Sequence, residues 1–167
     1  MLIKNEYASP LGKIEIVADE NSVKGVWFEN QKYYGSKYDL ATIAKKENKV
    51  IRQVWNWLDD YFSGKKPKID KALLKPEGTA FQKKVFEILS EIPYGKTITY
   101  KEIANMLADK EAGKKFFARA VGGAVGHNPI AILIPCHRVV GSDGSLTGYA
   151  GGIEKKIELL TLEGIDL

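Results

Sequence analysis

The sequence predicts an α+β fold in two parts, residues 1–75 and residues 76–167. Three observations lead to this prediction. Short strand-like segments gather within the first 30 residues, whereas helical spacing of apolar residues dominates from residue 79 onward. Between them, residues 65–78 form a basic stretch that contains Pro67 and Pro76, a composition typical of a linker. We therefore expect a sheet-containing N-terminal domain and a mainly helical C-terminal domain.

The first part begins with three strand-like segments at residues 2–8, 13–18 and 23–29. They are rich in Val, Ile, Tyr, Phe and Trp and are separated by turn residues, a pattern that predicts a small antiparallel sheet. Residues 47–63 then carry apolar side chains at helical spacing, and Gly64 is a natural C-terminal stop. The sequence thus predicts one helix that packs on the sheet.

The second part predicts three successive helices. Thr79 is followed three residues later by Gln82, a capping-box pattern that begins an amphipathic run ending near residue 89. A second capping box, from Thr99 to Glu102, begins a helix over residues 100–107, and residues 114–125 form the next candidate. Two short helices joined by a turn resemble a helix-turn-helix, which in different proteins binds DNA or serves packing alone.

The last of these helices has an unusual composition. It contains Gly122 and Gly123, and each glycine costs a helix about 1 kcal/mol relative to alanine. Tight helix packing is one explanation. The other is close approach to a narrow surface such as the DNA minor groove, which is only about 6 Å wide. Arg119 is the one long cation in the middle of this helix, so a DNA-binding role would involve little sequence preference.

Composition limits the classes of function. The net charge is +4 with a pI near 9.0, but all of that excess lies in residues 1–75, and residues 76–167 are neutral overall. Bulk charge therefore gives no direct indication of a nucleic-acid partner. A single cysteine forbids an internal disulfide and favours the reducing cytoplasm. One Cys and two His do not suffice for a usual structural zinc site, and no segment reads as a signal peptide or membrane span.

The cysteine, Cys136, raises the central question about function. Residues 131–134, AILI, read as a short buried strand that Pro135 ends, so the thiol is either a small apolar filler or a nucleophile. His137 follows at once, but neighbours on a strand point in opposite directions. It would reach the thiol only if the chain bends or a water bridges the two. Glu163, on a C-terminal helix, is a candidate to orient the histidine or a solvated helix-end residue.

Two segments after the cysteine also carry expectations. Residues 141–152 contain five glycines and Tyr149, and they form either a wall that accepts a flat ligand or a plain surface loop. On the C-terminal helix we expect Ile157 and Leu160 in the core, with Lys155 and Lys156 on the solvent face.

At this point the motifs resemble those of a known family. The run IPCHRVVGSDGSLTGYAGG, together with GTAFQKKVFEILSEIPYGKTITYKEIA, RAVGGAVGHNPIAILIPCHRV and LLTLEG, is similar to the O6-alkylguanine-DNA alkyltransferases. The resemblance covers nearly all of residues 78–164, whereas the N-terminal half matches only a loose pattern. It implies a small RNase H-like α/β domain, followed by a mainly helical domain with a winged-helix-like helix-turn-helix.

The resemblance also implies roles for individual residues. Cys136 would accept the alkyl group, His137 would take its proton through water with Glu163 as orienting group, Asn128 would brace the site, and Tyr100 would donate to the leaving guanine. Arg119 would fill the place of the flipped nucleotide. It assigns substrate contacts to Tyr100, Val139, Tyr149, Ala150 and Gly151, and DNA contacts to Gln82, Tyr100, Lys101, Lys114, Ala118, Arg119, Ala120, Gly122 and Ser142.

The resemblance therefore predicts a direct-reversal DNA repair protein that flips out O6-alkylguanine and acts once per molecule. It implies no cofactor and no metal, a monomer in the cytoplasm, and double-stranded DNA bound through the minor groove with little sequence preference. Two alternatives remain open from the residues. One is a cysteine–histidine hydrolase, which would turn over many times, and the other is a non-catalytic DNA-binding regulator, in which Cys136 would be dispensable.

Overall fold

The computed structural model describes residues 1–146 and 148–167. The chain divides into two compact units. The first unit contains Met1–Glu77 together with Pro129–Leu133, and the second contains Gly78–Asn128 together with Ile134–Leu167. The second half of the sequence thus contributes a five-residue segment, Pro129–Leu133, to the first unit. The predicted domain ranges, 1–75 and 76–167, are each contiguous and do not contain this contribution.

The first unit is built on a four-stranded sheet of order β3-β2-β1-β4. Its strands are β1 (Ile3–Ser9), β2 (Gly12–Ala18), β3 (Val23–Phe28) and β4 (Ala44–Lys45). The first three form the predicted antiparallel sheet, and the two-residue β4 pairs in parallel with β1. The tight turn between β1 and β2 requires Gly12, whose φ of 111° favours glycine.

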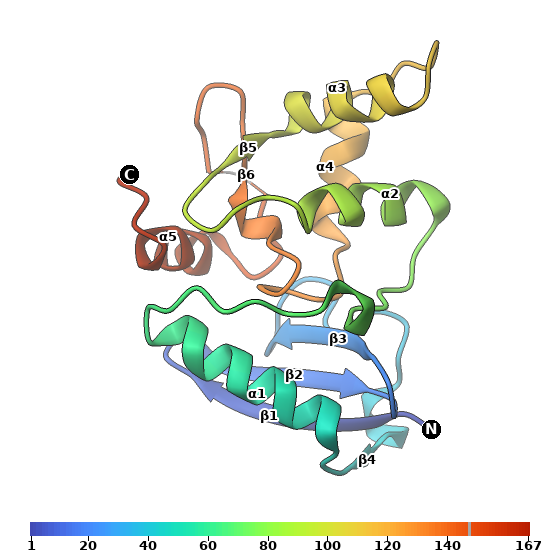
Figure 1. Cartoon of the computed structure of the whole chain (residues 1–167), viewed down its shortest axis with the longest axis vertical. Helices are drawn as coiled ribbons and strands as arrows, with labels where there is room; N and C mark the ends of the chain where they lie inside the picture. Colours follow the sequence, from blue (N-terminus) through green and yellow to red (C-terminus); the bar gives the residue numbers. More distant parts are fainter. Residues whose placement is uncertain (147) are drawn as a thin grey trace. The chain divides into compact units, whose positions relative to one another are not determined.

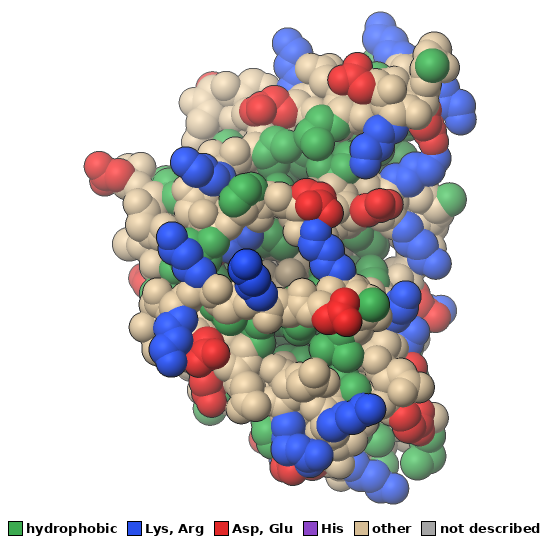
Figure 2. All heavy atoms as spheres, in the orientation of Figure 1, with side chains coloured by type: hydrophobic (Ala, Val, Ile, Leu, Met, Phe, Trp, Pro, Cys, Tyr) green, Lys and Arg blue, Asp and Glu red, His purple; other side chains and the backbone are tan. Residues whose placement is uncertain are grey.

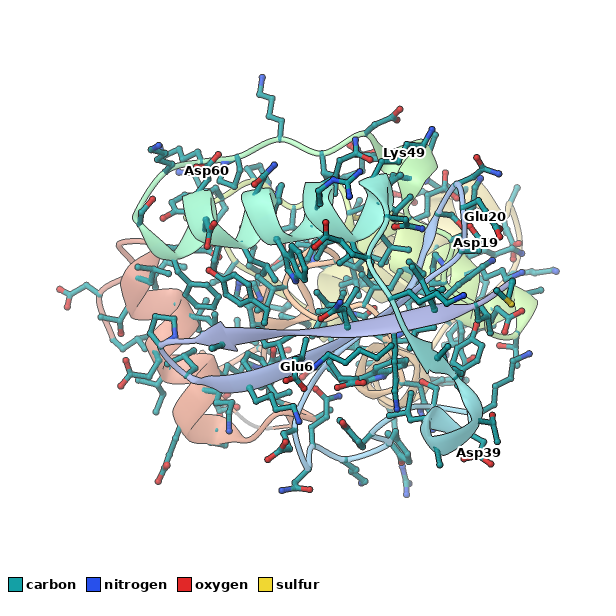
Figure 3. All side chains as sticks on the ribbon, turned by 90° about the horizontal axis from the view of Figure 1, so that it is seen from below. Glu6, Asp19, Glu20, Asp39, Lys49 and Asp60 are labelled. Atoms are coloured by element: carbon teal, nitrogen blue, oxygen red, sulfur yellow. The ribbon has the colours of Figure 1, made fainter. Side chains whose placement is uncertain are left out.

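Helix α1 (Lys49–Phe62) covers one face of this sheet. Asn48 caps its N-terminus, so the helix begins two residues after the predicted start. The Trp55 indole of α1 donates to the Glu6 carbonyl at 3.0 Å. Figure 3 shows α1 on one side of the strands and the Glu6 side chain on the other. The period of apolar residues in α1 therefore corresponds to real burial against the sheet.

The opposite face of the sheet is covered by the segment between β3 and β4, which includes the 3₁₀ turn η1 (Leu40–Thr42). Trp27 is fully buried there and makes edge-to-face contacts with Tyr34 and Tyr38. Its indole lies over Gly25, where a Cβ atom would be 1.9 Å from the ring. A glycine is therefore required at this position of β3.

Two later segments join the edge of β3. A bridge pairs Val23 with Leu74, which follows the 3₁₀ turn η2 (Lys71–Leu73). On the same strand, the Val26 amide donates to the Pro129 carbonyl at 2.8 Å, and the Ala131 amide donates to the Val26 carbonyl at 2.9 Å. These two bonds explain why Pro129–Leu133 belongs to the first unit.

In the part of the second unit that the structure describes, there are four α-helices and a pair of short strands, which are labelled in Figure 1. The elements are α2 (Ala80–Leu89), β5 (Ile98–Thr99), α3 (Tyr100–Lys110), α4 (Ala118–Gly126), the 3₁₀ turn η3 (Cys136–Arg138), β6 (Val139–Val140) and α5 (Ile153–Leu162). Helices α2, α3 and α4 pack against one another. Both predicted capping boxes are confirmed, with Thr79 and Thr99 as N-caps.

Three expectations about this half are wrong. Helix α4 begins at Ala118 rather than at residue 114, so seven residues connect it to α3. Residues 131–134 form turns rather than a strand, and Ile132 takes a left-handed φ of 69°. On α5, the solvent and core faces are partly exchanged: Ile157 is 38% exposed, whereas Lys156 is 1% exposed. None of the helices in the described ranges is long and apolar enough to cross a membrane.

Candidate active site

Cys136 opens the 3₁₀ turn η3, directly after Pro135. Cys136 is 6% exposed, and its amide donates to the Ile134 carbonyl at 2.8 Å. Because the chain turns here instead of continuing as a strand, Cys136 and His137 are both buried rather than placed on opposite faces of a sheet. The bend that a thiol–histidine pair needs is therefore present.

Strands β5 and β6 pair next to this turn (Figure 1). Their parallel register pairs Ile98 with Val139 and Thr99 with Val140, so α3 begins directly after a strand that pairs with the residues following η3. Burial raises the pKa of the Tyr100 phenol, and the negative charge of a Cys136 thiolate raises it further. At neutral pH this hydroxyl keeps its proton and is able to donate it.

Asn128 is a further neighbour of the thiol. It is 4% exposed, its side-chain amide donates to the Ile134 carbonyl at 2.8 Å, and its side chain also hydrogen-bonds the Cys136 sulfur. Burial raises the pKa of the Cys136 thiol, while the Asn128 hydrogen bond and the charge of Lys156 lower it in part. The thiol is thus protonated at rest and needs a base to become a nucleophile.

His137 is the base that the geometry offers. Its Nε2 lies 2.6 Å from Oε2 of Glu163, and neither side chain is exposed. A carboxylate only accepts hydrogen bonds, so Nε2 carries the proton and Nδ1 of the neutral ring is an acceptor. Burial lowers the pKa of His137 more than the neighbouring Glu163 raises it, which keeps the imidazole neutral and basic near pH 7.

Arg138 completes this network, a role that the sequence alone did not predict. Its Nε and Nη2 donate to the two oxygens of Glu163 at 2.7 and 3.0 Å, and its Nη1 donates to the Ile92 carbonyl at 2.7 Å. The Gly95 amide donates to Glu163 Oε1 at 3.0 Å. Such a fork fixes the carboxylate in one orientation. Only the adjacency of Arg138 to the Cys-His pair pointed to it in the sequence.

Lys156 was also missed, because the sequence pattern placed it on the solvent face. Its Nζ donates to the Val139 carbonyl at 2.6 Å, three residues after the cysteine. Burial lowers the pKa of Lys156, and the nearby Cys136 raises it in part. Two successive lysines on α5 give no sequence signal that distinguishes the buried Lys156 from its neighbour Lys155.

The glycine-rich loop approaches Tyr100. A Cβ atom added at Gly148 would lie 3.5 Å from the Tyr100 hydroxyl, so the backbone passes close to it. The Tyr149 hydroxyl is buried and has no hydrogen-bond partner among the described residues. Burial raises the pKa of Tyr149 well above its usual value. Ala150 and Gly151 are half-buried beside it, and a flat ligand would meet a neutral phenol here.

The residues expected to contact DNA are distributed over several elements of the second unit. Most are exposed: Lys101, Lys114, Ala118, Arg119, Ala120 and Ser142. Gln82 is half-buried and its side-chain oxygen accepts from the Thr79 amide, so it has a capping role. Gly122 is half-buried, and a Cβ atom there would lie 3.8 Å from the Tyr100 ring. On the face drawn in Figure 2, basic and acidic side chains are interspersed.

Comparisons with known proteins identify the family. The family model described as 6-O-methylguanine DNA methyltransferase, DNA binding domain, matches residues 80–165, and the model of the ribonuclease-like domain of the same family matches residues 2–74. The chain belongs to the 6-O-methylguanine DNA methyltransferase family. The predicted α+β fold, with an RNase H-like first part, is confirmed by these matches and by the structural neighbours below.

Individual members of the 6-O-methylguanine DNA methyltransferase family are similar over most of the chain. A methylated-DNA–protein-cysteine methyltransferase of Methanosarcina barkeri is 46% identical over 155 residues, covering 93% of this chain and 92% of that protein. One of Haemophilus influenzae is 42% identical over 159 residues, covering 95% and 84%.

Solved structures of family members are also similar to this chain. The crystal structure of the Mycobacterium tuberculosis O6-methylguanine methyltransferase has a TM-score of 0.83 and 37% identity, covering 98% of this chain and 93% of that chain. A crystal structure of the M. tuberculosis OGT in complex with DNA has a TM-score of 0.81 and 37% identity, covering 96% and 91%. The hydrolase and the non-catalytic regulator are therefore not favoured.

Proposed function

We propose that this protein repairs DNA by transferring the alkyl group of O6-alkylguanine to the sulfur of its own Cys136. The observation that carries the proposal is the buried Cys136 directly before the network of His137, Glu163 and Arg138, within a chain whose two parts both match the family. Such a network suits neither a filler thiol nor a surface histidine.

The residues supply each part of the reaction. His137 takes the thiol proton through a bridging water, while Glu163 stabilises the imidazolium that forms and Asn128 holds the sulfur. The thiolate attacks the alkyl carbon, a sulfur–carbon bond forms, and the bond from carbon to O6 breaks with its electron pair left on guanine. Tyr100 donates a proton to the purine, so the base leaves neutral, and the proton held by His137 then returns through water to the Tyr100 phenolate. Overall, the thiol hydrogen replaces the alkyl group on guanine.

The substrate is bound as a flipped base. Extrusion of a nucleotide from the duplex costs a few kcal/mol, and Arg119 offsets part of this cost by filling the vacated place. The flipped purine is held by Tyr149, by the backbone of Ala150 and Gly151, and by the Val139 carbonyl, which has a second lone pair beside its bond to Lys156.

Double-stranded DNA is bound through the minor groove, with little sequence preference, because the exposed start of α4 offers small side chains and one long cation. Lys101, Lys114 and Ser142 contact the backbone, and Ala118, Ala120, Gly122 and Gln82 lie along the path of the duplex. The protein acts as a monomer in the cytoplasm and needs no cofactor and no metal for this transfer.

Each molecule reacts once. The product is a thioether, which has no carbonyl for water to attack, and the sequence contains no second cysteine to remove the group. The protein is therefore consumed in proportion to the lesions that it repairs.

Intact-mass measurement tests this function directly. After mixing with a duplex that carries O6-methylguanine, we expect a single added methyl group, mapped to Cys136 and formed 1:1 with the lesion lost. Cys136→Ser should bind the same duplex and gain no mass. Multiple turnovers per molecule, or a methyl group mapped to another residue, would exclude the proposal.

A further inference from the structure

The start of α4 carries an exposed aromatic residue that the proposed function does not use. Phe117 is 62% exposed, more than any other aromatic residue in the described ranges. Its neighbour Phe116 stacks on Phe81 at 6.0 Å with an interplanar angle of 10°. Since successive residues of an extended segment point in opposite directions, one phenylalanine anchors the segment while the other faces solvent.

Phe117 also stands where a capping residue is expected. Helices α2 and α3 have complete capping boxes with Thr79 and Thr99 as N-caps, whereas the N-cap of α4 is Phe117, which makes no side-chain cap hydrogen bond. Ser, Thr, Asp and Asn stabilise this position, and large apolar residues do not. Phe117 therefore costs stability twice, by its exposure and by the missing cap, which indicates a role in contact rather than in folding.

The charges around Phe117 indicate an anionic partner. Residues 110–119 contain four Lys or Arg and a single acidic residue, although the second half of the chain is neutral overall. Lys115 Nζ lies 5.5 Å from the centre of the Phe117 ring, and the exposed Arg119 follows two residues later. On the face drawn in Figure 2, basic side chains lie around the end of α3 and the loop after it, with acidic side chains among them.

We propose that Phe117 is a second DNA-deforming residue, an apolar wedge that packs into the minor groove beside the place filled by Arg119. This inference rests on the proposed function. Proteins that bend DNA from the minor groove insert apolar side chains against base steps and partly unstack them. A wedge next to Arg119 would lower the cost of extruding the damaged nucleotide, and the surrounding lysines would hold the phosphates on either side.

Phe117→Ser separates this role from a structural one, because serine removes the ring and supplies the missing cap. We expect its melting temperature to equal or exceed that of the wild type. The single-turnover rate on duplex O6-methylguanine should fall about tenfold or more, in line with loss of aromatic stacking on bases. The rate with free O6-benzylguanine should stay unchanged, since a free base needs no extrusion.

Two further variants act as controls. Phe117→Trp keeps a stacking ring and should stay within about twofold of the wild type on duplex DNA, given the general stacking capacity of aromatic side chains. Met106→Ser removes a 38% exposed apolar residue from α3 and should leave both rates unchanged.

Wild-type duplex rates in Phe117→Ser, or equal slowing on duplex and free base, would overturn the wedge while the proposed function stood. If the wild type itself failed to react with the duplex, the proposed function would fall, and the wedge with it.

Discussion

The proposed chemistry depends on His137, Arg138 and Glu163, three buried ionisable side chains that form one hydrogen-bonded network. Glu163 is shared between His137 and Arg138, and a salt bridge at 2.7 Å balances its charge before the histidine is protonated. Burial alone would make each of these groups costly, so their pairing is what permits a base in this place. In the proposed reaction, the carboxylate of Glu163 is thus already oriented when His137 takes the thiol proton.

Glu163→Gln tests this at the level of the reaction. The amide keeps a hydrogen-bond acceptor but loses the charge that stabilises an imidazolium, so alkyl transfer at pH 7 should slow by roughly 10²-fold. At higher pH the thiol ionises without help, and the deficit should shrink. DNA affinity should be nearly unchanged. Single-turnover rates against pH, measured with DNA binding alongside, check this, and a deficit that is constant with pH would remove Glu163 from the proton relay.

We also expect Glu163→Gln to lower the free energy of unfolding. It leaves the Arg138 guanidinium buried without its anion, and breaking a buried pair in this way costs about 3 kcal/mol or more. Denaturant unfolding of Glu163→Gln should show this loss, whereas Cys136→Ser, which leaves the network intact, should not.

Lys156 makes a separate contribution to the thiol. Its charge lowers the pKa of Cys136, which burial has raised, and Lys156→Met keeps the length of the side chain while it removes the charge. The thiol pKa should rise, so the rate with free O6-benzylguanine should fall several-fold at pH 7 and approach the wild-type rate as pH increases. The neighbouring Lys155→Met is the matched control. Identical pH–rate profiles for Lys156→Met and the wild type would contradict an electrostatic role.

At the scale of single elements, features set by neighbouring residues were predictable from the sequence, whereas features set by tertiary contacts were not. The capping boxes at Thr79 and Thr99 depend on residues three positions apart, so the sequence alone identifies them. The start of α4 depends on the packing of Phe116 on Phe81, and the turns at residues 131–134 depend on the bonds of Val26. The burial of Lys156 likewise depends on the Val139 carbonyl, which lies 17 residues earlier in the chain.

Strand β2 carries a costly residue on the face away from α1. Glu15 is 6% exposed and lies directly opposite Glu6 in the register of β1 and β2. Burial raises the pKa of Glu15, despite the nearby positive charges of Lys4 and Lys13, which lower it in part. A cavity of about 300 Å³ is lined by these side chains.

Glu15→Gln should therefore stabilise the protein at neutral pH. The pKa of Glu15 is higher in the folded state than in the unfolded state, so as pH rises the unfolded chain loses the Glu15 proton first. The free energy of unfolding of the wild type therefore falls above the unfolded pKa of about 4.3. The gain from Gln should be full at pH 8 and should vanish toward pH 4. Thermal melts of both proteins at the two pH values measure it, and an equal difference at both would show that charge burial is not its cause.

At the scale of the whole molecule, the sequence predicted two parts because the linker composition is visible in it. The placement of Pro129–Leu133 in the first unit was not predictable from the sequence, because it depends on hydrogen bonds to a strand more than 100 residues earlier. The polypeptide consequently crosses from one unit to the other three times: after Glu77, after Asn128 and after Leu133.

Because the chain crosses between the units three times, cleavage in the linker should not separate them. Lys65, Lys66 and Lys68 lie in an exposed part of the linker, where trypsin should cut. The C-terminal piece still carries the residues that bond Val26 on β3, so the two pieces should remain together on size-exclusion chromatography, keep their alkyl-transfer activity, and part only in denaturant. Pieces that separate in plain buffer would contradict this. The nicked protein would therefore behave as a split protein, in which two pieces are active only together. The N-terminal piece alone lacks Pro129–Leu133, the segment that bonds the edge of β3.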